Sequence, residues 1–534
     1  MKSLDIRGIT RWHLIKDPVT KVRLLASVTG LLLFVLYLPE LIWSERYASL
    51  LRWGGAAVLV IFVSAWSWYR WGKSHGEAIV KWLDRHSTGI LAFFILGYAV
   101  INFYLSYGIR IQNHLGQTSD TGIFEQIQWN TLHGQFFYSS DEKGLHFGVH
   151  NSPILVAETP LYAVWQDVGV LFGLQTLALS LAAVPLFVIG RKYLRPSTAL
   201  ICAIAFLLHP SILSQHFTLY EIRLAPLFVL CALYWFDDKY FAGYSVTALL
   251  AMMVKENIPL LFLLNGLRSV TQKRSWQWIA MSLLFPLFWF GLSLWIVSQN
   301  PNGTGNFLGK HFDYLGHSVG EVVARVLLQP MTIVSNLLSN PSLKLYSLYE
   351  RLLPFVGLPV GSALSALALP DLGIQFLVRE PDAFPIGSNY SNVIVGIFAY
   401  STIFTLAGIR HRHKWLAEQL GYVVLGATLL SLPVTVSPAM FQINSEYTRS
   451  VDQVISIVGP QASISAPANL VQAFAKRSLV FNNEYHDRDT VLSTDYVLVD
   501  LARVDSAKWM FLQSDPQYEI VFRSTRLVLF RRIK

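Results

Sequence analysis

The segment SDTGIFEQIQWNTLHGQ, residues 119–135, carries acids, amides and a histidine directly after an apolar stretch. Two interpretations of its first acid, Asp120, are open. Either Asp120 or Ser119 caps a helix, because short oxygen-bearing side chains bind the free N–H groups of a first turn. Alternatively, Asp120 is a general base held at a membrane surface. The two roles are difficult to combine, because a capping carboxylate is stabilised as an anion and is a weaker base.

The apolar residues of this segment predict a helix from Gly122 to Leu132 that lies in the membrane interface. Ile123, Phe124, Ile127 and Leu132 suit one side of such a helix. We expect the polar neighbours of Asp120 to face solvent or to support the site without touching substrate. These neighbours are Glu125, Gln126 and His133.

Two histidines occur in the next polar segment, LHFGVHNSPILVAETPLY. His146 and His150 come just before Asn151, Ser152 and Pro153, an order that is typical of a helix start. Three interpretations are open: structural or solvated histidines, contacts to a phosphate at the helix N-terminus, and a metal-binding pair. The metal pair requires a helical segment, whereas the glycine between the histidines and the cap that follows favour a loop.

Charged residues also lie at the ends of later apolar runs. In HFTLYEIRLAP, Glu221 and Arg223 form either an interfacial anchor or part of a polar site. In MVKENIPL, Lys255 and Glu256 interrupt two apolar arms that are each too short to span a bilayer comfortably. A charge at mid-bilayer costs roughly 2.5–3.5 kcal/mol, so charges there usually face a cavity or a partner. We predict that Lys255 is a cation for a lipid phosphate.

Two other segments offer polar side chains. NPNGTGNFLGKHFDYLGHS has a length typical of a lid, and SNYSN places Tyr390 before a later apolar run as a candidate substrate contact. The first segment carries a glycosylation sequon at Asn302 and the side chains of Lys310, His311, Asp313 and His317.

The elements that must position these residues are membrane helices. Only 14% of the 534 residues are charged and 53% are hydrophobic, whereas an average soluble domain has about 25% charged residues. We therefore predict an α-helical polytopic membrane protein with about 13 transmembrane helices. The predicted spans are 24–41, 51–68, 89–105, 168–189, 199–213, 224–236, 245–254, 258–267, 278–296, two short helices within 345–377, 393–409 and 420–436.

Basic residues predict the orientation of these spans. They all fall on one side of the membrane if the spans alternate, and by the positive-inside rule that side is cytoplasmic. The N-terminus is then cytoplasmic, and the candidate acids, histidines and Lys255 collect on the outer face. The net charge of +9 comes from these dispersed residues and does not indicate nucleic-acid binding. The basic clusters lie at 7–23, 70–85, 191–195, 268–274 and 410–414.

The C-terminal segment changes character. Helix-like stretches at 451–458 and 502–513 accompany five short runs that have the composition of strands. We predict a small α/β domain over 439–534, outside the membrane. The five runs are ASISA, SLVFN, DYVLVDL, YEIVFRS and RLVLFRR.

Over most of residues 85–530 the chain resembles a large family of predicted bacterial and archaeal membrane proteins of uncharacterised function. That family is similar to the GT-C class of glycosyltransferases, which includes protein mannosyltransferases, aminoarabinose transferases and oligosaccharyltransferases. The resemblance implies a GT-C-like transmembrane domain over 86–438 with outer loops 107–152 and 299–343. Residues 1–85 are then a cytoplasmic segment and two additional helices. The segments that carry the resemblance are SDTGIFEQIQWNTLHGQFFYSS, HFGVHNSPILVAETPLYAV, MVKENIPLLFLLNGL and TDYVLVDL.

The resemblance also implies roles for individual residues. GT-C enzymes carry an acid in the first outer loop, which matches Asp120, and often a second acid in a later outer loop, for which Glu221 is the best match. Both are candidate catalytic residues. The family commonly has a histidine where this chain has Tyr220, which departs from its pattern. The candidates for binding substrate or phosphate are His146, His150, Tyr220, Arg223, Lys255 and Glu256.

The implied donor is a sugar on a polyprenyl-phosphate or polyprenyl-diphosphate carrier at the outer side of a prokaryotic cytoplasmic membrane. A divalent metal is used by some GT-C enzymes and not by others. The expected reaction is a single inverting displacement in which Asp120 takes the proton of an acceptor hydroxyl, while cations stabilise the departing lipid phosphate. The acceptor is a glycan, a lipid or a protein.

Two alternatives remain beside the glycosyltransferase. One is a transporter or flippase of lipids or lipid-linked sugars, and the other is a non-catalytic assembly protein with a GT-C-like layout. A transporter is expected to show repeated halves with polar groups near mid-membrane. Here the polar groups cluster on one face and no repeat is visible.

Overall fold

The computed structural model describes residues 73–116, 118–299, 312–316, 319–378, 390–432 and 438–533. The chain divides into two units, Met1–Glu77 and Ala78–Lys534. The first two predicted spans, 24–41 and 51–68, lie outside the described residues. The second unit holds the other predicted spans, the candidate site residues and the C-terminal sheet.

Four described helical segments are long and apolar enough to cross a membrane, and a bent pair of helices raises this number to five. The bend of 46° follows His209, where Pro210 has no N–H with which to continue the helix. The four segments are α3 (Lys73–Phe103) with η2 (Tyr104–Ile111), α6 (Val168–Leu181) with α7 (Ala183–Tyr193), α13 (Trp276–Ile279) with η7 (Ala280–Leu284) and α14 (Phe285–Ser298), and α20 (Ser391–Arg412). The bent pair is α8 (Pro196–Leu207) and α9 (Pro210–Ser214) with η5 (Gln215–Phe217).

Several other predicted spans are shorter helices in the structure. The proline-rich stretch 345–377 is divided into short helical pieces, as its prolines predict. A total of about 13 spans therefore stays a prediction. The shorter elements are α10 (Ala225–Asp237), α11 (Phe241–Met252), α12 (Ile258–Thr271), α18 (Pro341–Leu352), η8 (Leu353–Phe355), η9 (Leu358–Gly361), η10 (Ala363–Ala368), α19 (Leu369–Leu377) and α21 (Lys414–Ser431).

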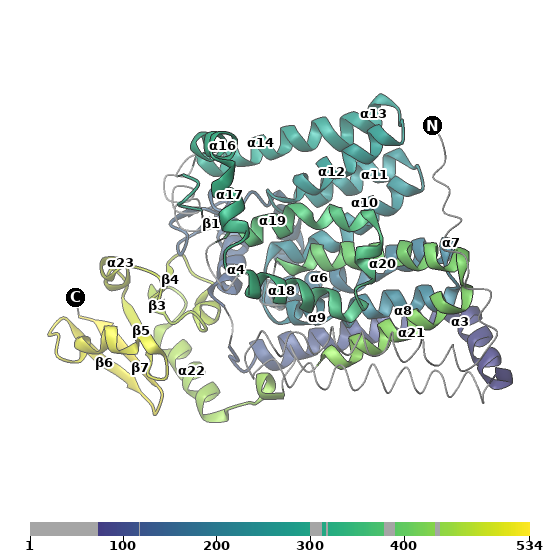
Figure 1. The fold of residues 1–534 in the computed structure, drawn as a ribbon. Helices are drawn as coiled ribbons and strands as arrows, with labels where there is room; N and C mark the ends of the chain where they lie inside the picture. Colours follow the sequence, from purple (N-terminus) through teal and green to yellow (C-terminus); the bar gives the residue numbers. More distant parts are fainter. Residues whose placement is uncertain are drawn as a thin grey trace. The chain divides into compact units, whose positions relative to one another are not determined.

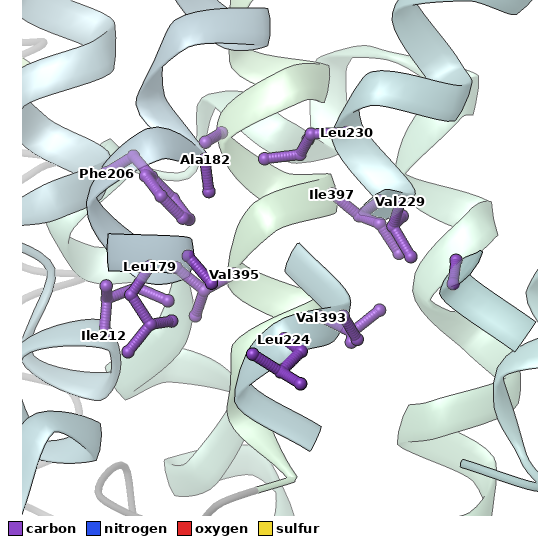
Figure 2. Close-up of a cluster of buried hydrophobic side chains, with 14 of the residues drawn as sticks. Leu179, Ala182, Phe206, Ile212, Leu224, Val229, Leu230, Val393, Val395 and Ile397 are labelled. Carbon is purple, nitrogen blue, oxygen red and sulfur yellow. The ribbon is translucent and has the colours of Figure 1, made fainter. Parts of the chain in front are cut away.

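Helix α20 lies in the core of the helical part, in contact with α7, α8, α10 and α21 (Figure 1). Its residues 391–403 are buried without exception, which is expected of a helix that is apolar on all sides. Side chains from α6, α8, α9, η6 (Glu221–Leu224), α10 and α20, and Ala182 between α6 and α7, form one apolar cluster (Figure 2). This packed core fixes the helix ends that carry the candidate residues. The labelled members are Leu179, Ala182, Phe206, Ile212, Leu224, Val229, Leu230, Val393, Val395 and Ile397.

Polar contacts gather the basic residues at one end of the helical part. Arg195 forms an ion pair with Asp84 at 2.9 Å, and Arg410 donates to the carbonyl oxygen of Tyr193 at 2.8 Å. Lys192 and Arg268 form ion pairs with the neighbouring acids Asp238 and Asp237 at 2.5 Å and 2.7 Å, respectively. The predicted clustering of these basic residues is therefore seen in the structure.

The C-terminal sheet has five strands in the order β4-β3-β5-β7-β6. β3 is parallel to β4 and β5, whereas β7 is antiparallel to β5 and β6. All five predicted strand runs form strands, and helix α22 (Ser445–Val458) packs against them. The strands are β3 (Ile464–Ala466), β4 (Val480–Asn482), β5 (Tyr496–Asp500), β6 (Tyr518–Arg523) and β7 (Leu527–Arg532), with η14 (Val471–Phe474), α23 (Arg488–Leu492) and η15 (Val504–Gln513) between them.

Short elements carry the candidate residues between the longer helices. Helix α4 (Ser119–Leu132) is followed by β1 (Tyr138–Ser139) and β2 (Gly144–Leu145), which pair antiparallel. The remaining short elements are η3 (His146–Gly148), η4 (Pro153–Glu158), α5 (Thr159–Val164), η6 (Glu221–Leu224), α16 (Val319–Leu328), α17 (Pro330–Leu337) and η13 (Pro438–Phe441).

Candidate active site

A buried ion pair lies at the centre of the candidate site. Nζ of Lys255, between α11 and α12, is 2.7 Å from Oε1 of Glu221 at the start of η6, and the side chains are 6% and 2% exposed. Burial alone raises the pKa of Glu221, but Lys255 and the nearby His150 and His146 outweigh it and lower this pKa to about 2. A carboxylate held so firmly as an anion is a poor proton acceptor. Glu221 therefore suits the task of holding Lys255 better than that of a base.

Asp120 has the opposite electrostatic character. It lies in the first turn of α4, is partly buried, and shares a hydrogen bond with the hydroxyl of Tyr220. Burial, with smaller contributions from the charges of Glu221 and Glu142, raises the pKa of Asp120, although the Tyr220 hydrogen bond opposes this shift. A carboxylate with a raised pKa is a stronger base.

The capping interpretation of this acid is wrong. The residue at the N-cap position of α4 is Thr118, and Ser119 and Asp120 are the first two helical residues. Asp120 is thus free of the capping role that makes a carboxylate a weaker base.

The two histidines each face a glutamate. Nδ1 of His146 lies 2.9 Å and 3.0 Å from the two carboxylate oxygens of Glu142. Nδ1 of His150 lies 3.0 Å from Oε1 of Glu256, whose second oxygen accepts from the backbone N–H of Asn151 at 3.2 Å. The segment that holds both histidines is a single 3-10 turn followed by loop. This geometry agrees with the loop that the glycine between them predicts.

Arg223 is a second buried cation beside the ion pair. Its Nη1 donates to the carbonyl oxygen of Thr218 at 2.5 Å, while its Nε has no hydrogen-bond partner among the described residues. The charges of Glu158, Glu221 and Asp120 all act on this guanidinium. Arg223 therefore keeps unused donor capacity inside the polar cluster.

Tyr390 is held in place by a buried network. Its ring centroid lies 5.5 Å from Nζ of Lys255, and its carbonyl oxygen accepts from Nε2 of Gln375 at 2.8 Å. Nη2 of the fully buried Arg351 donates to Oε1 of Gln375 at 3.0 Å and to Oγ of Ser391 at 2.7 Å. The network fixes the start of α20 and, with it, the ring beside Lys255.

Eight residues that the sequence predicts as catalytic or substrate-binding thus interact in one cluster on the ends of several helices. Three further residues, Glu142, Glu158 and Tyr390, interact electrostatically with this cluster. The sequence did not indicate Glu142 or Glu158 as site residues, and it indicated Tyr390 only weakly. Glu158 interrupts an apolar run and was detectable on that ground. Glu142 gives no such signal. The eight residues are Asp120, His146, His150, Tyr220, Glu221, Arg223, Lys255 and Glu256.

The three residues expected to support the site lie elsewhere. Glu125 is buried rather than solvent-facing, and its carboxylate accepts from Nε2 of Gln472 at 3.0 Å. Nε2 of Gln126 donates to Oγ of Ser140 at 2.9 Å and to the carbonyl oxygen of Arg477 at 3.0 Å. Gln472 and Arg477 belong to the C-terminal domain, so these two side chains attach α4 to that domain.

His133 and the predicted interfacial helix also need correction. His133 is exposed and stacks on Trp129 with ring centroids 3.8 Å apart. Helix α4 is buried on nearly all sides, and a Cβ added at Gly122 would lie 2.7 Å from Cγ1 of Val471. The apolar side chains Ile123, Phe124 and Ile127 belong to the buried apolar cluster of the helical part, and the C-terminal domain contacts α4 at Gly122, Glu125 and Gln126.

The remaining predictions concern the lid and a metal. Asn302, Lys310, His311 and His317 lie outside the described residues, while Asp313 is described and its carboxylate accepts from the N–H of Tyr314. Within the described ranges, no group of three or more His, Cys, Asp or Glu residues could hold a metal ion.

Among solved structures, the fold is similar to that of ArnT from Cupriavidus metallidurans bound to undecaprenyl phosphate, with a TM-score of 0.50 and 9% sequence identity. The match covers 82% of this chain and 97% of that chain. The Archaeoglobus fulgidus oligosaccharyltransferase in complex with Zn and sulfate matches with a TM-score of 0.38 and 11% identity, over 82% of this chain and 73% of that chain. The ArnT likeness shows a GT-C-like fold.

Sequence comparison identifies the family. No curated protein sequence matches the chain. Residues 113–523 match the family model described as "Predicted membrane protein (DUF2079)". Because this match covers more than half of the 534 residues, the chain belongs to the DUF2079 family of predicted membrane proteins.

Proposed function

We propose that this protein is a GT-C-type glycosyltransferase that moves a sugar from a polyprenyl-phosphate-type lipid to an acceptor hydroxyl on the outer face of the membrane. The observation that carries the proposal is the contrast between two acids in one cluster. Asp120 has a raised pKa and suits proton acceptance, whereas Glu221 is locked in an ion pair with Lys255. A general base and a buried cation in one cluster suit transfer from a phosphate leaving group.

The proposed reaction is a single displacement. The acceptor oxygen forms a bond to the anomeric carbon as the bond from that carbon to the phosphate oxygen breaks, so the configuration inverts. The acceptor proton passes to Asp120, and the bonding electrons leave with the lipid phosphate. An ammonium has three donors, so Lys255 can bind that phosphate while it keeps Glu221.

The lipid nature of the donor has two supports. The ArnT of similar fold binds undecaprenyl phosphate, and the cluster here lies at the ends of apolar helices. The positive-inside rule supports the outer location, because the basic residues occupy one end of the helical part and the cluster lies at the other.

The test is turnover by the purified full-length protein with a panel of polyprenyl-phosphate sugars. Release of lipid phosphate together with sugar transfer is the expected result. If no donor of the panel is used or bound, the proposal is overturned.

A further inference from the structure

Glu142 and His146 form a close pair at the edge of the proposed site. Both carboxylate oxygens of Glu142 lie within 3.0 Å of Nδ1 of His146, and the side chains are 10% and 1% exposed, respectively. A carboxylate accepts hydrogen bonds, so Nδ1 must carry a proton. The pair therefore fixes the orientation of the imidazole ring and the protonation of Nδ1, one of its two nitrogens.

The other ring nitrogen has no protein partner. Nε2 of His146 is buried and makes no hydrogen bond to any described residue. The ring packs edge-on against Phe124 and His150, with centroids 5.5 Å and 6.4 Å away. A buried nitrogen without a hydrogen-bond partner destabilises the folded protein, because it loses its bonds to water. A ligand that bonds to this nitrogen would remove that destabilisation.

The surrounding charges decide which ligand suits this nitrogen. Besides Glu142, the titratable groups facing His146 are Glu221, Lys255 and His150. Burial lowers the pKa of His146, but the Glu142 carboxylate outweighs burial, so that this pKa lies above its usual range. This shift favours the imidazolium, which carries an N–H at Nε2, and an N–H donor of positive charge suits an anionic oxygen.

We propose that Glu142 is a positioning residue that keeps His146 as an imidazolium, whose Nε2–H donates a hydrogen bond to the phosphate of the lipid-linked donor. This inference rests on the proposed function and adds to it a residue and a protonation requirement. Glu142 acts through His146 and does not itself touch the substrate. Phosphate binding must then weaken as the pH rises and His146 loses its proton.

The experiment measures binding of methyl farnesyl phosphate to the full-length protein in detergent between pH 5 and pH 9. This phosphodiester carries one negative charge across that range, so any pH dependence belongs to the protein. The wild type is expected to bind more weakly as the pH rises. A wild type that binds equally at every pH, or not at all, overturns the inference.

Variants separate charge from geometry. Glu142→Gln keeps an oxygen that can accept from Nδ1 but removes the charge, so burial lowers the pKa of His146. We expect a loss of about 10- to 100-fold in affinity at pH 7, the value of one charge-assisted hydrogen bond, and recovery of affinity at low pH. Glu142→Asp keeps the charge and should behave as the wild type does. His146→Gln should weaken binding across the range and abolish the part of the pH dependence that Glu142→Gln shifts.

The neighbouring pair of Asp141 and His486 provides the matched control. Oδ1 of Asp141 lies 2.8 Å from Nε2 of His486, both side chains are buried, and the pair joins the same loop to the C-terminal domain. Asp141→Asn should leave the pH profile of binding unchanged. If Glu142→Gln and Asp141→Asn weaken binding alike at all pH values, Glu142 has only a structural role and the inference fails.

The outcome is separable from that of the proposed function. Sugar transfer without any effect of Glu142→Gln on phosphodiester binding overturns the inference alone. Phosphodiester binding with the expected pH dependence, in a protein that transfers no sugar, overturns the proposed function alone.

Discussion

The ammonium of Lys255 lies 2.7 Å from Oε1 of Glu221, and both side chains are almost fully buried. Neither residue belongs to a long helix: Lys255 lies between α11 and α12, and Glu221 begins a 3-10 turn before α10. The ion pair therefore connects two segments outside the long helices, at the place where we propose that the donor phosphate binds.

Breaking this pair should be costly. Lys255→Met leaves the Glu221 carboxylate buried without its cation, which destabilises proteins by about 3–5 kcal/mol. The double variant Lys255→Met/Glu221→Leu removes both charges and should regain much of that loss. Thermal unfolding in detergent measures both effects. A double variant that is no more stable than the single one would show that the pair is not the source of the loss.

Replacing the proposed base should abolish transfer. Asp120→Asn retains the size of the side chain but cannot accept the acceptor proton, and we expect a loss of about 10²–10⁴-fold in rate with donor binding unchanged. Glu125→Gln is the control, because Glu125 lies on the same helix but faces the C-terminal domain. The assignment of Asp120 is disproved if both variants turn over at the wild-type rate.

Tyr220 should set the pH at which the base becomes active. The reaction needs ionised Asp120, so the rate rises with pH as Asp120 loses its proton. The Tyr220 hydrogen bond lowers the pKa of Asp120, in opposition to burial. Tyr220→Phe should therefore move the acid limb of the pH–rate profile to higher pH. If the acid limb does not move while transfer stays intact, Tyr220 does not control the pKa of the proposed base.

Glu125 should make stability depend on pH. Burial raises the pKa of Glu125 to about 7, against an ordinary value of about 4.3 in an unfolded chain. The folded state therefore favours the protonated form, and the stability that this form contributes is lost as the pH rises towards 7. Glu125→Gln should flatten the decline in melting temperature between pH 5 and pH 8. Parallel curves for variant and wild type would contradict this account.

Cysteine labelling should test the proposed orientation. Ser514 is exposed in the C-terminal domain and Gln272 is exposed at the basic end of the helical part. In a background with Cys202 and Cys231 replaced by alanine, a membrane-impermeant maleimide should label Ser514→Cys in intact cells and Gln272→Cys only after lysis. The reverse pattern would place the C-terminal domain on the cytoplasmic side.

The sequence predicted the five strands and the gathering of Asp120, Glu221 and Lys255, because both follow from local patterns. A strand is recognised from the composition of a few neighbouring residues. Because successive membrane spans alternate in direction, every second connection between them lies on the same side of the membrane. The burial of α4 was not predictable in this way. Its covering residues, such as Gln472 and Arg477, lie more than 340 residues further along the chain.

The pairing of Glu142 with His146 was also not predictable from the sequence, although the two residues are close together in the chain. The two residues are four positions apart, but β2 lies between them and no helix brings them together. Only the turn from β2 into η3 places the carboxylate against the ring. A contact that depends on the path of a loop leaves no periodic trace in the sequence.

Helix α4 presents Asp120 to the polar cluster and, six residues later, Gln126 to the C-terminal domain. An α-helix turns by about 100° per residue. One amino acid inserted or deleted between these two positions would swing one of the two side chains away from its partners, whichever half of the helix moved. The spacing from Asp120 to Gln126 is therefore a fixed length, and natural relatives that share this architecture should tolerate exchanges of residue type there but no change in number.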